Sequence, residues 1–198
     1  PCLEVIDDQV GPIEGLWIGD IDGDGATEVL AGTTIYRRRA GGRWTGQSFL
    51  SGYQMTRLAV GDLTGRGPLD IVIAEGESDP GRLAIWRAAE RRVDVLRDDL
   101  FHPHSLALAD FSGSGRLDIL VAEMGLGRHP APRLLIYRNL GDGRFEETLI
   151  SSGIPLHEAK VADMTGDGRP DIVGKPYSPQ RHVDIWFNET VTPQRSRP

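Results

Sequence analysis

Short apolar segments alternate with glycine-rich polar loops along the whole chain of 198 residues. In one stretch, residues 105–111 and 117–122 are small or apolar, and a polar loop lies between them. Residues 133–138 and 144–150 follow, joined by Gly141-Asp142-Gly143, and Asp-Gly between two strand-like runs favours a β-hairpin. Convincing helical periodicity, with an apolar residue every 3.6 positions and end caps, is absent from the sequence. The pattern predicts four short strands in this stretch and little helix in the chain.

The same pattern occurs four times. A loop that begins with aspartate recurs at roughly 40–50-residue spacing, which is typical of propeller blades, at Asp20, Asp62, Asp110 and Asp163. An isoleucine–aromatic pair recurs in step with it, at Ile35-Tyr36, Ile85-Trp86, Ile136-Tyr137 and Ile185-Trp186. Two independent series with matching order indicate a true repeat.

We therefore predict an all-β fold, a β-propeller with four four-stranded blades. The expected repeats cover residues 9–50, 51–98, 99–151 and 152–190 of one propeller domain, with an outer strand over 2–8 and a C-terminal tail over 191–198. Because the N-terminal strand resembles an outer strand, it could complete the last blade and close the ring. The alternative is a four-blade portion of a larger propeller.

Composition narrows the classes of function. The chain has 25 glycines and 13 prolines, which suits a fold rich in turns. A net charge of −7 argues against a nucleic-acid partner, and the lack of a long apolar run argues against membrane insertion. Its single cysteine, Cys2, excludes an internal disulfide and a thiolate metal cluster.

The first aspartate-rich loop carries the strongest chemical signal. Acidic side chains stand at its first, third, fifth and ninth positions, and glycines at the fourth and sixth permit a tight turn. Four acids in nine residues repel one another unless a hard cation lies among them, and such oxygen ligands suit Ca²⁺. The expected ligands are Asp20, Asp22, Asp24, the Ala26 carbonyl and Glu28.

The other three loops have fewer charges, and we expect two to three calcium sites in total. The fourth loop offers Asp163, Thr165, Asp167, the Arg169 carbonyl and Asp171. Weaker binding is expected in the third loop, at Asp110, Ser112, Ser114, Arg116 and Asp118. In the second loop Arg66 could replace the ion by charge-assisted hydrogen bonds. The alternative for the second and third loops is an ordinary Asx turn without metal.

Each of these loops leads into an apolar strand, and the loops recur at a regular spacing. In both respects they resemble the FG-GAP or VCBS repeat family, whose repeats also build the propeller of integrin alpha subunits. The resemblance implies a propeller with calcium in the loops, carried by Asp20, Asp22, Asp24, Glu28, Asp163, Asp167 and Asp171. The chain departs from the family pattern at Arg66, Ser112 and Ser114. Function does not follow from the family, because its propellers serve as adhesion modules, carbohydrate-binding units and lyase domains.

If the four loops share one face of the disc, the opposite ends of the same strands share the other. The polar residues expected there are His102, His104, Glu123, His157, Glu158, Lys160, Lys175 and Tyr177. Histidines with a glutamate could bind a transition metal such as Zn²⁺. His104, His157, Lys160 and Lys175 are also candidate acids and bases for a lyase or dehydratase that acts on a sugar-derived substrate. The alternative is a solvated polar rim without chemistry.

From these residues we predict a calcium-binding propeller that binds a carbohydrate or protein ligand in a secreted, cell-surface or periplasmic setting, because such open sites fill at extracellular calcium levels. Two alternatives remain open: the lyase or dehydratase domain, and a scaffold for protein–protein interaction. Further blades or domains of a longer chain are additional expected partners.

Overall fold

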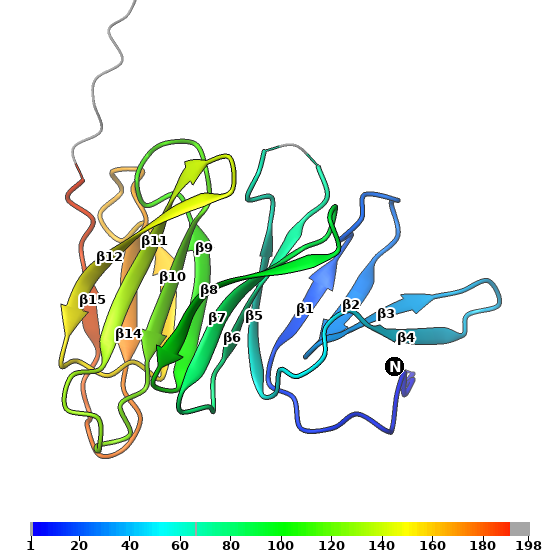
Figure 1. Cartoon of the computed structure of the whole chain (residues 1–198), viewed down its shortest axis with the longest axis horizontal. Helices are drawn as coiled ribbons and strands as arrows, with labels where there is room; N and C mark the ends of the chain where they lie inside the picture. Colours follow the sequence, from blue (N-terminus) through cyan, green and yellow to red (C-terminus); the bar gives the residue numbers. More distant parts are fainter. Residues whose placement is uncertain (1, 66, 191–198) are drawn as a thin grey trace, which may run out of the picture. The chain divides into compact units, whose positions relative to one another are not determined.

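The computed structural model describes residues 2–65 and 67–190, and within them every regular element is a β-strand (Figure 1). The first sheet contains β1 (Leu16–Gly19), β2 (Glu28–Ala31), β3 (Thr34–Arg38) and β4 (Trp44–Ser48). The second contains β5 (Thr56–Gly61), β6 (Asp70–Glu75), β7 (Gly81–Arg87) and β8 (Arg92–Leu100). The all-β prediction is confirmed, and the described residues include no helix long and apolar enough to cross a membrane.

The third sheet contains β9 (Pro103–Ala109), β10 (Asp118–Glu123), β11 (Arg133–Gly141) and β12 (Arg144–Ser152). The fourth contains β13 (Glu158–Ala162), β14 (Asp171–Lys175) and β15 (Asp184–Trp186). In all four sheets the strands pair in chain order, and the registers are antiparallel. Each sheet is therefore a meander built from one continuous segment of the chain.

The fourth sheet has three strands in the described residues, where four were expected. Residues 2–8 form no strand, so the expected N-terminal outer strand is not observed. Leu3 and Val5 expose their side chains, and this segment is held instead by the Tyr36 hydroxyl, which donates to Asp7 Oδ2 at 2.7 Å. The predicted tail over 191–198 lies outside the described residues.

The chain divides into two compact units. The first contains β1–β8 and ends at His104, and its apolar core includes Ile21, Leu30, Ile35, Ile71 and Ile73. The second begins at Ser105 and also includes Leu63–Gly65, with a core formed by Phe111, Leu120, Ala122, Leu134, Ile136, Leu156, Ala159 and Ile172. Every residue of β6 and β10 is buried, because these second strands are covered on both faces. That is why their sequences are continuous apolar runs instead of alternating ones.

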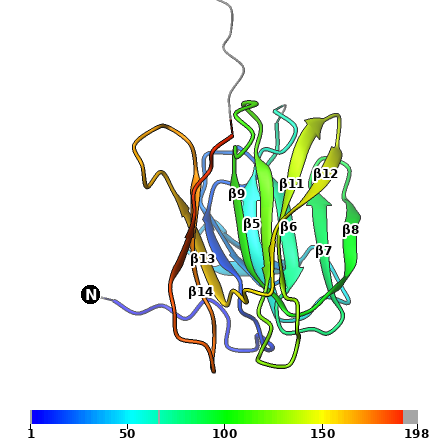
Figure 2. The same ribbon diagram turned by 90° about the vertical axis from the view of Figure 1, so that its left-hand side faces the viewer.

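The hairpin of β11 and β12 matches the prediction from its turn residues (Figure 2). Gly141 pairs with Arg144, which leaves Asp142 and Gly143 as a two-residue turn. Both turn residues have positive φ, 54° and 75°, as a type I′ turn requires. The turn fixes the register of the longest hairpin in the second unit.

Candidate functional site

Four loops join the first strand of each sheet to the second, and each loop ends in an acid that is the first residue of the second strand. These acids are almost completely buried: Glu28, Asp70, Asp118 and Asp171. A buried carboxylate requires hydrogen-bond or charge partners, since desolvation without them is costly. Each loop therefore ends at a buried carboxylate that needs such partners.

The first loop brings three of its predicted ligands together. Asp20, Asp22 and Glu28 each offer one carboxylate oxygen, and these oxygens lie within 4.8 Å of one another. Asp20 holds the turn, because its two oxygens accept from the N–H groups of Gly23 at 2.7 Å and Gly25 at 2.8 Å. Both glycines have positive φ, 79° and 86°, which only glycine adopts without strain.

Two aspartates of the first loop, Asp24 and Asp22, have partners within the protein. Asp24 Oδ1 accepts from the Ala26 N–H at 2.7 Å, and Asp24 is not one of the three converging acids. The Arg37 guanidinium lies 3.0 Å from Asp22 Oδ2 and supplies positive charge at the loop. A bound cation would share Asp22 with Arg37, a contact that sequence reasoning missed.

The fourth loop is closed mainly by its own backbone. Asp163 accepts from the N–H groups of Thr165, Gly166, Asp167 and Gly168. These hydrogen bonds, above all that of Gly168, hold the pKa of Asp163 below its ordinary value of 3.8, with desolvation opposing them. Asp167 forms an ion pair with Arg169, and Asp171 Oδ2 accepts from the Met164 N–H at 2.9 Å. The three carboxylates of the fourth loop thus already have hydrogen-bond or ion-pair partners within the protein.

The third loop has the same backbone with fewer acids. Asp110 accepts from the N–H groups of Ser114 and Gly115, and the Ser112 hydroxyl lies 3.4 Å from Asp110 Oδ1. Asp118 accepts from the Ser112 N–H at 3.0 Å. Arg116 directs its side chain to the Asn139 carbonyl at 2.8 Å. The two carboxylates of this loop, like those of an Asx turn, are already satisfied by N–H groups.

The second loop contains a buried ion pair that the sequence analysis did not identify. Arg66 lies outside the described residues. The partner of Asp70 is Arg87, at the end of β7, with Nη1 2.9 Å from Asp70 Oδ2 and Nε 3.0 Å from Asp94 Oδ2. Burial raises the pKa of Asp70, and the Arg87 charge opposes that shift. In this loop an arginine supplies a positive charge to the terminal acid.

Two asparagines link loops of successive repeats in the second unit. The backbone N–H of Asn139 donates to Asp118 at 2.7 Å, and that of Asn188 donates to Asp171 at 2.8 Å. Their side-chain Nδ2 groups reach back to the preceding loop, at the carbonyls of Leu63 and Phe111. Each asparagine stands three residues after the isoleucine of the repeated isoleucine–aromatic pair, and this recurrence is the signal that could have identified it.

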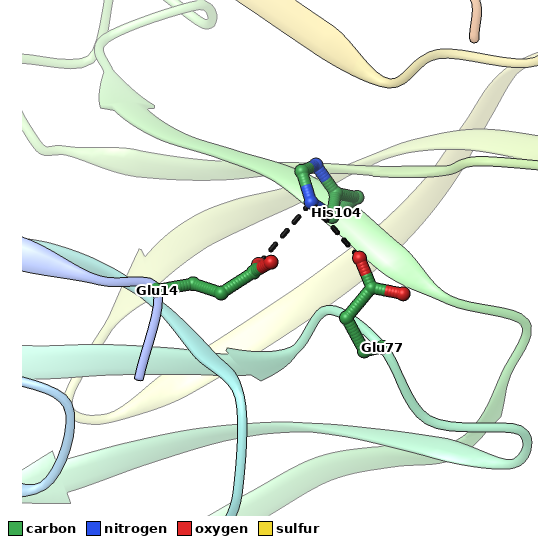
Figure 3. Close-up of side chains that lie close together, drawn as sticks. All are labelled: Glu14, Glu77 and His104. Atoms are coloured by element: carbon green, nitrogen blue, oxygen red, sulfur yellow. Dashed lines mark ion pairs between the residues drawn. The ribbon is translucent and has the colours of Figure 1, made fainter. Parts of the chain in front are cut away.

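The opposite ends of the strands carry the predicted histidines. In the first unit, His104 lies on β9 with its Nε2 3.2 Å from Glu14 and 3.4 Å from Glu77 (Figure 3). His102 is also in this unit, with Nδ1 3.6 Å from Glu77 Oε2. Glu14 and Glu77 were not among the predicted site residues.

Glu123 has a structural partner. It is fully buried and forms an ion pair with Arg133, whose Nη2 and Nε both donate to Oε1, at 2.6 and 3.1 Å. The backbone N–H of Arg133 also donates to Glu123 Oε2 at 2.7 Å. Glu75 and Arg82 form the equivalent pair in the second sheet. Both glutamates fix the connection between a second and a third strand.

The remaining predicted rim residues lie at one end of β13 and β14, in the second unit. The rings of His157 and Tyr177 are 5.1 Å apart, and Tyr177 is 54% exposed. Glu158 pairs with Lys175 in the strand register and forms an ion pair with Lys160 at 2.7 Å. His104 and His157 belong to different units, and each has its own neighbours.

The family model agrees with the repeat pattern in part of the chain. Residues 110–174 match the family model of the FG-GAP-like repeat, which confirms the resemblance over the third and fourth loops. No curated protein matches the chain. The crystal structure of the V. cholerae biofilm matrix protein Bap1 is similar, with 19% identity and a TM-score of 0.48 over 80% of this chain. The match spans 23% of the length of that protein.

The Asp70–Arg87 pair yields a first prediction. Replacing Arg87 with methionine leaves a buried carboxylate beside an apolar side chain, and we expect a loss of about 3–5 kcal/mol in the free energy of unfolding. Urea unfolding measures the loss, and Asp70→Asn in the same background should recover part of it. The matched control is Arg138→Met, which breaks the exposed Arg138–Glu146 pair and should cost about 0–1 kcal/mol. Equal losses in the two arginine variants would contradict the assignment.

The lowered pKa of Asp163 yields a second prediction. A depressed pKa in the folded state stabilises the protein above the pKa of the unfolded state, and this contribution disappears as the pH falls through the folded value. Asp163→Asn should therefore lower the melting temperature at pH 6, and the gap from the original protein should narrow below about pH 4. Thermal unfolding in chelator at both pH values measures this. A gap that is the same at pH 6 and pH 3 would refute a role for the charge.

Proposed function

We propose that the four sheets are blades of a calcium-stabilised β-propeller that acts outside the cytoplasm as a binding module for a carbohydrate or protein ligand. The FG-GAP-like repeat match supports the propeller, as do four consecutive antiparallel meanders. Meander sheets that repeat in tandem bury their faces against their neighbours, which is the principle of a propeller. The chain contributes its blades alone or together with further blades of a longer protein.

The convergence of Asp20, Asp22 and Glu28 carries the calcium proposal. Ca²⁺ binds oxygens at about 2.3–2.6 Å, so two ligands on opposite sides of one ion are separated by at most about 5 Å. The three carboxylate oxygens satisfy this limit, since all lie within 4.8 Å of one another. Three negative charges at this spacing repel one another, and a divalent cation removes the repulsion.

The other loops would bind calcium less tightly. The fourth loop has Asp163, Asp167 and Asp171, but Arg169 already neutralises Asp167. The third loop has two acids with two serines between them. Affinity for Ca²⁺ depends on the number of charged ligands and the rigidity of the site. Asp22 and Asp167 each have an arginine partner, so the order first, fourth, third rests on the number of acids in each loop and on the convergence of three of them in the first. Open sites of this kind suit the millimolar calcium found outside cells.

The ligand-binding surface that we propose is the end of β13 and β14 with His157, Glu158, Lys175 and Tyr177. The exposed Tyr177 ring beside His157 offers an aromatic face, and Lys175 and Glu158 flank it with charge. Aromatic rings with an apolar face and a polar edge pack against sugar rings and protein side chains alike. This combination supports recognition of a polar ligand.

Calcium binding is tested by calorimetry and by thermal unfolding of the full chain. We expect Ca²⁺ to raise the melting temperature, because a ligand that binds only the folded state stabilises it. Asp22→Asn preserves the shape of a first-loop ligand while removing its charge, and it should weaken the tightest calcium site by roughly tenfold or more. The matched control is Asp142→Asn, which changes an acid of the β11–β12 turn and should leave calcium binding unchanged. An unchanged melting temperature with Ca²⁺ or chelator would overturn the proposal.

The ligand-binding surface is tested with glycan arrays and with pull-down of protein partners, using calcium-loaded protein. Tyr177→Ala should weaken binding of any ligand found by about tenfold, because it removes the exposed ring from the centre of the surface. Leu149→Ala removes a side chain of comparable exposure, 55%, from β12 and should have no effect. A ligand whose affinity is the same for both variants binds elsewhere on the chain.

A further inference from the structure

A cluster of three metal-ligating side chains lies in the first unit, away from the aspartate-rich loops. Glu14 precedes β1, Glu77 lies between β6 and β7, and His104 is the second residue of β9 (Figure 3). One ligand atom from each residue lies within 4.8 Å of the other two. Residues far apart in the sequence thus direct one nitrogen and two oxygens to a common point.

The backbone fixes the segments that carry these side chains. Gly15 lies so close to β5 that a Cβ atom there would be 2.5 Å from the Thr56 carbonyl oxygen, so no larger residue could follow Glu14. The Gly32 N–H donates to the Gly15 carbonyl at 2.9 Å. The loop of Glu77 is tied to the strand of His104 by the His102 N–H, which donates to the Ser78 carbonyl at 2.9 Å. Glu14 and Glu77 are therefore positioned before any ligand binds.

The two distances from His104 to the glutamates match the edges of a tetrahedral zinc site. Zn²⁺ binds nitrogen and oxygen at about 2.0–2.2 Å, so neighbouring ligands in a tetrahedron are about 3.3–3.5 Å apart. His104 Nε2 lies 3.2 Å from Glu14 Oε2 and 3.4 Å from Glu77 Oε1. The His104 side chain is 5% exposed, so its orientation is set by packing. Three ligands at these separations leave one tetrahedral position for water or another ligand.

Hydrogen bonding does not account for the position of Glu14. Its Oε2 atom is shielded from solvent and has no hydrogen-bond partner among the described residues, although His104 Nε2 is 3.2 Å away. A shielded carboxylate oxygen without a hydrogen bond is costly, and metal coordination is one of the ways in which proteins compensate such atoms. This is an observation independent of the grouping of the three residues.

Two more side chains lie beside the three ligands. His102 Nδ1 lies 3.6 Å from Glu77 Oε2, the oxygen that does not face His104, which is too far for a hydrogen bond. Arg57 Nη1 lies 3.7 Å from Glu14 Oε2 and places a positive charge beside the site. That charge opposes a cation, so Arg57 should limit the affinity.

We propose that Glu14, Glu77 and His104 bind a divalent transition-metal ion, with Zn²⁺ as the best-fitting ion. The imidazole nitrogen separates this site from the calcium loops, because Ca²⁺ is bound by oxygen ligands and Zn²⁺ by nitrogen and oxygen alike. A bound ion would join the segment before β1 to β9 and to the loop after β6. The site is independent of the proposed calcium module, and either can be absent without the other.

Zinc titration of the full, chelator-treated chain in saturating Ca²⁺ tests the proposal, with calorimetry and zinc X-ray absorption as readouts. We expect a site of one nitrogen and additional oxygens. His104→Ala and Glu77→Gln should each weaken Zn²⁺ binding by more than about tenfold, because each removes a ligand or its charge. His102→Ala should weaken it less than either, because His102 Nδ1 is too far from the Glu77 carboxylate for a hydrogen bond. Arg57→Gln should strengthen binding, because it removes the competing positive charge.

The matched control is His182→Ala, which removes a histidine 2.5 Å from the carboxylate of Asp184 on the surface. This variant should bind Zn²⁺ at the Glu14 site as tightly as the original chain. Circular dichroism identifies variants that fail to fold, and Glu77→Gln keeps the size and shape of the glutamate. Absence of Zn²⁺ binding to the folded original chain, or equal affinity in the folded Glu77→Gln variant, would overturn the proposal. Calcium binding measured in the same variants should not change, so failure here leaves the calcium proposal standing.

Discussion

The structure depends on a buried carboxylate at the first residue of each second strand. A charge out of water must be matched by donors or cations, and this requirement fixes the chain around it. Asp118 and Asp171 each accept from an N–H near the start of their own loop and from the N–H of an asparagine, Asn139 within β11 and Asn188 just after β15. Asp70 is matched by the Arg87 guanidinium together with the Ala88 N–H. One acid therefore sets the ends of the loop and the position of the third strand together.

This constraint also explains how the loops can differ in charge while keeping one backbone. The first aspartate of the loop and the acid at its end are satisfied by backbone N–H groups in the third and fourth loops, so the turn does not require a metal for its shape. The positions between them are then free to vary, as the serines of the third loop do. In the first loop the same backbone brings Asp22 and Glu28 near Asp20, so that three acids converge where they could hold a metal ion.

The repeat and its strands follow from the sequence because both depend on local signals: apolar period, turn glycines and spacing. The hairpin at Asp142 and the buried run of β10 are examples. Partners that come from distant positions were not predictable in the same way. Hydrogen bonds to the loops come from residues 15 to 77 positions away in the sequence, namely Arg37, Arg87 and Asn188. A local sequence pattern does not predict which acid a distant arginine contacts. Glu14 and Glu77 approach His104 only through the packing of separate strands and loops.

Asn188, which follows the last strand of the fourth sheet, is also a candidate site of covalent modification. Asn188-Glu189-Thr190 is an acceptor sequence for N-linked glycosylation, in which the sugar is attached to the side-chain nitrogen of the asparagine. In the folded chain that nitrogen donates to the Phe111 carbonyl at 2.9 Å, and Asn188 Oδ1 accepts from the Thr190 N–H. A glycan would replace one of the two hydrogens on this nitrogen and would crowd the contact between successive repeats. In a host that glycosylates this sequence, the sugar and the link from Asn188 to the third loop would therefore compete for space at the same atom.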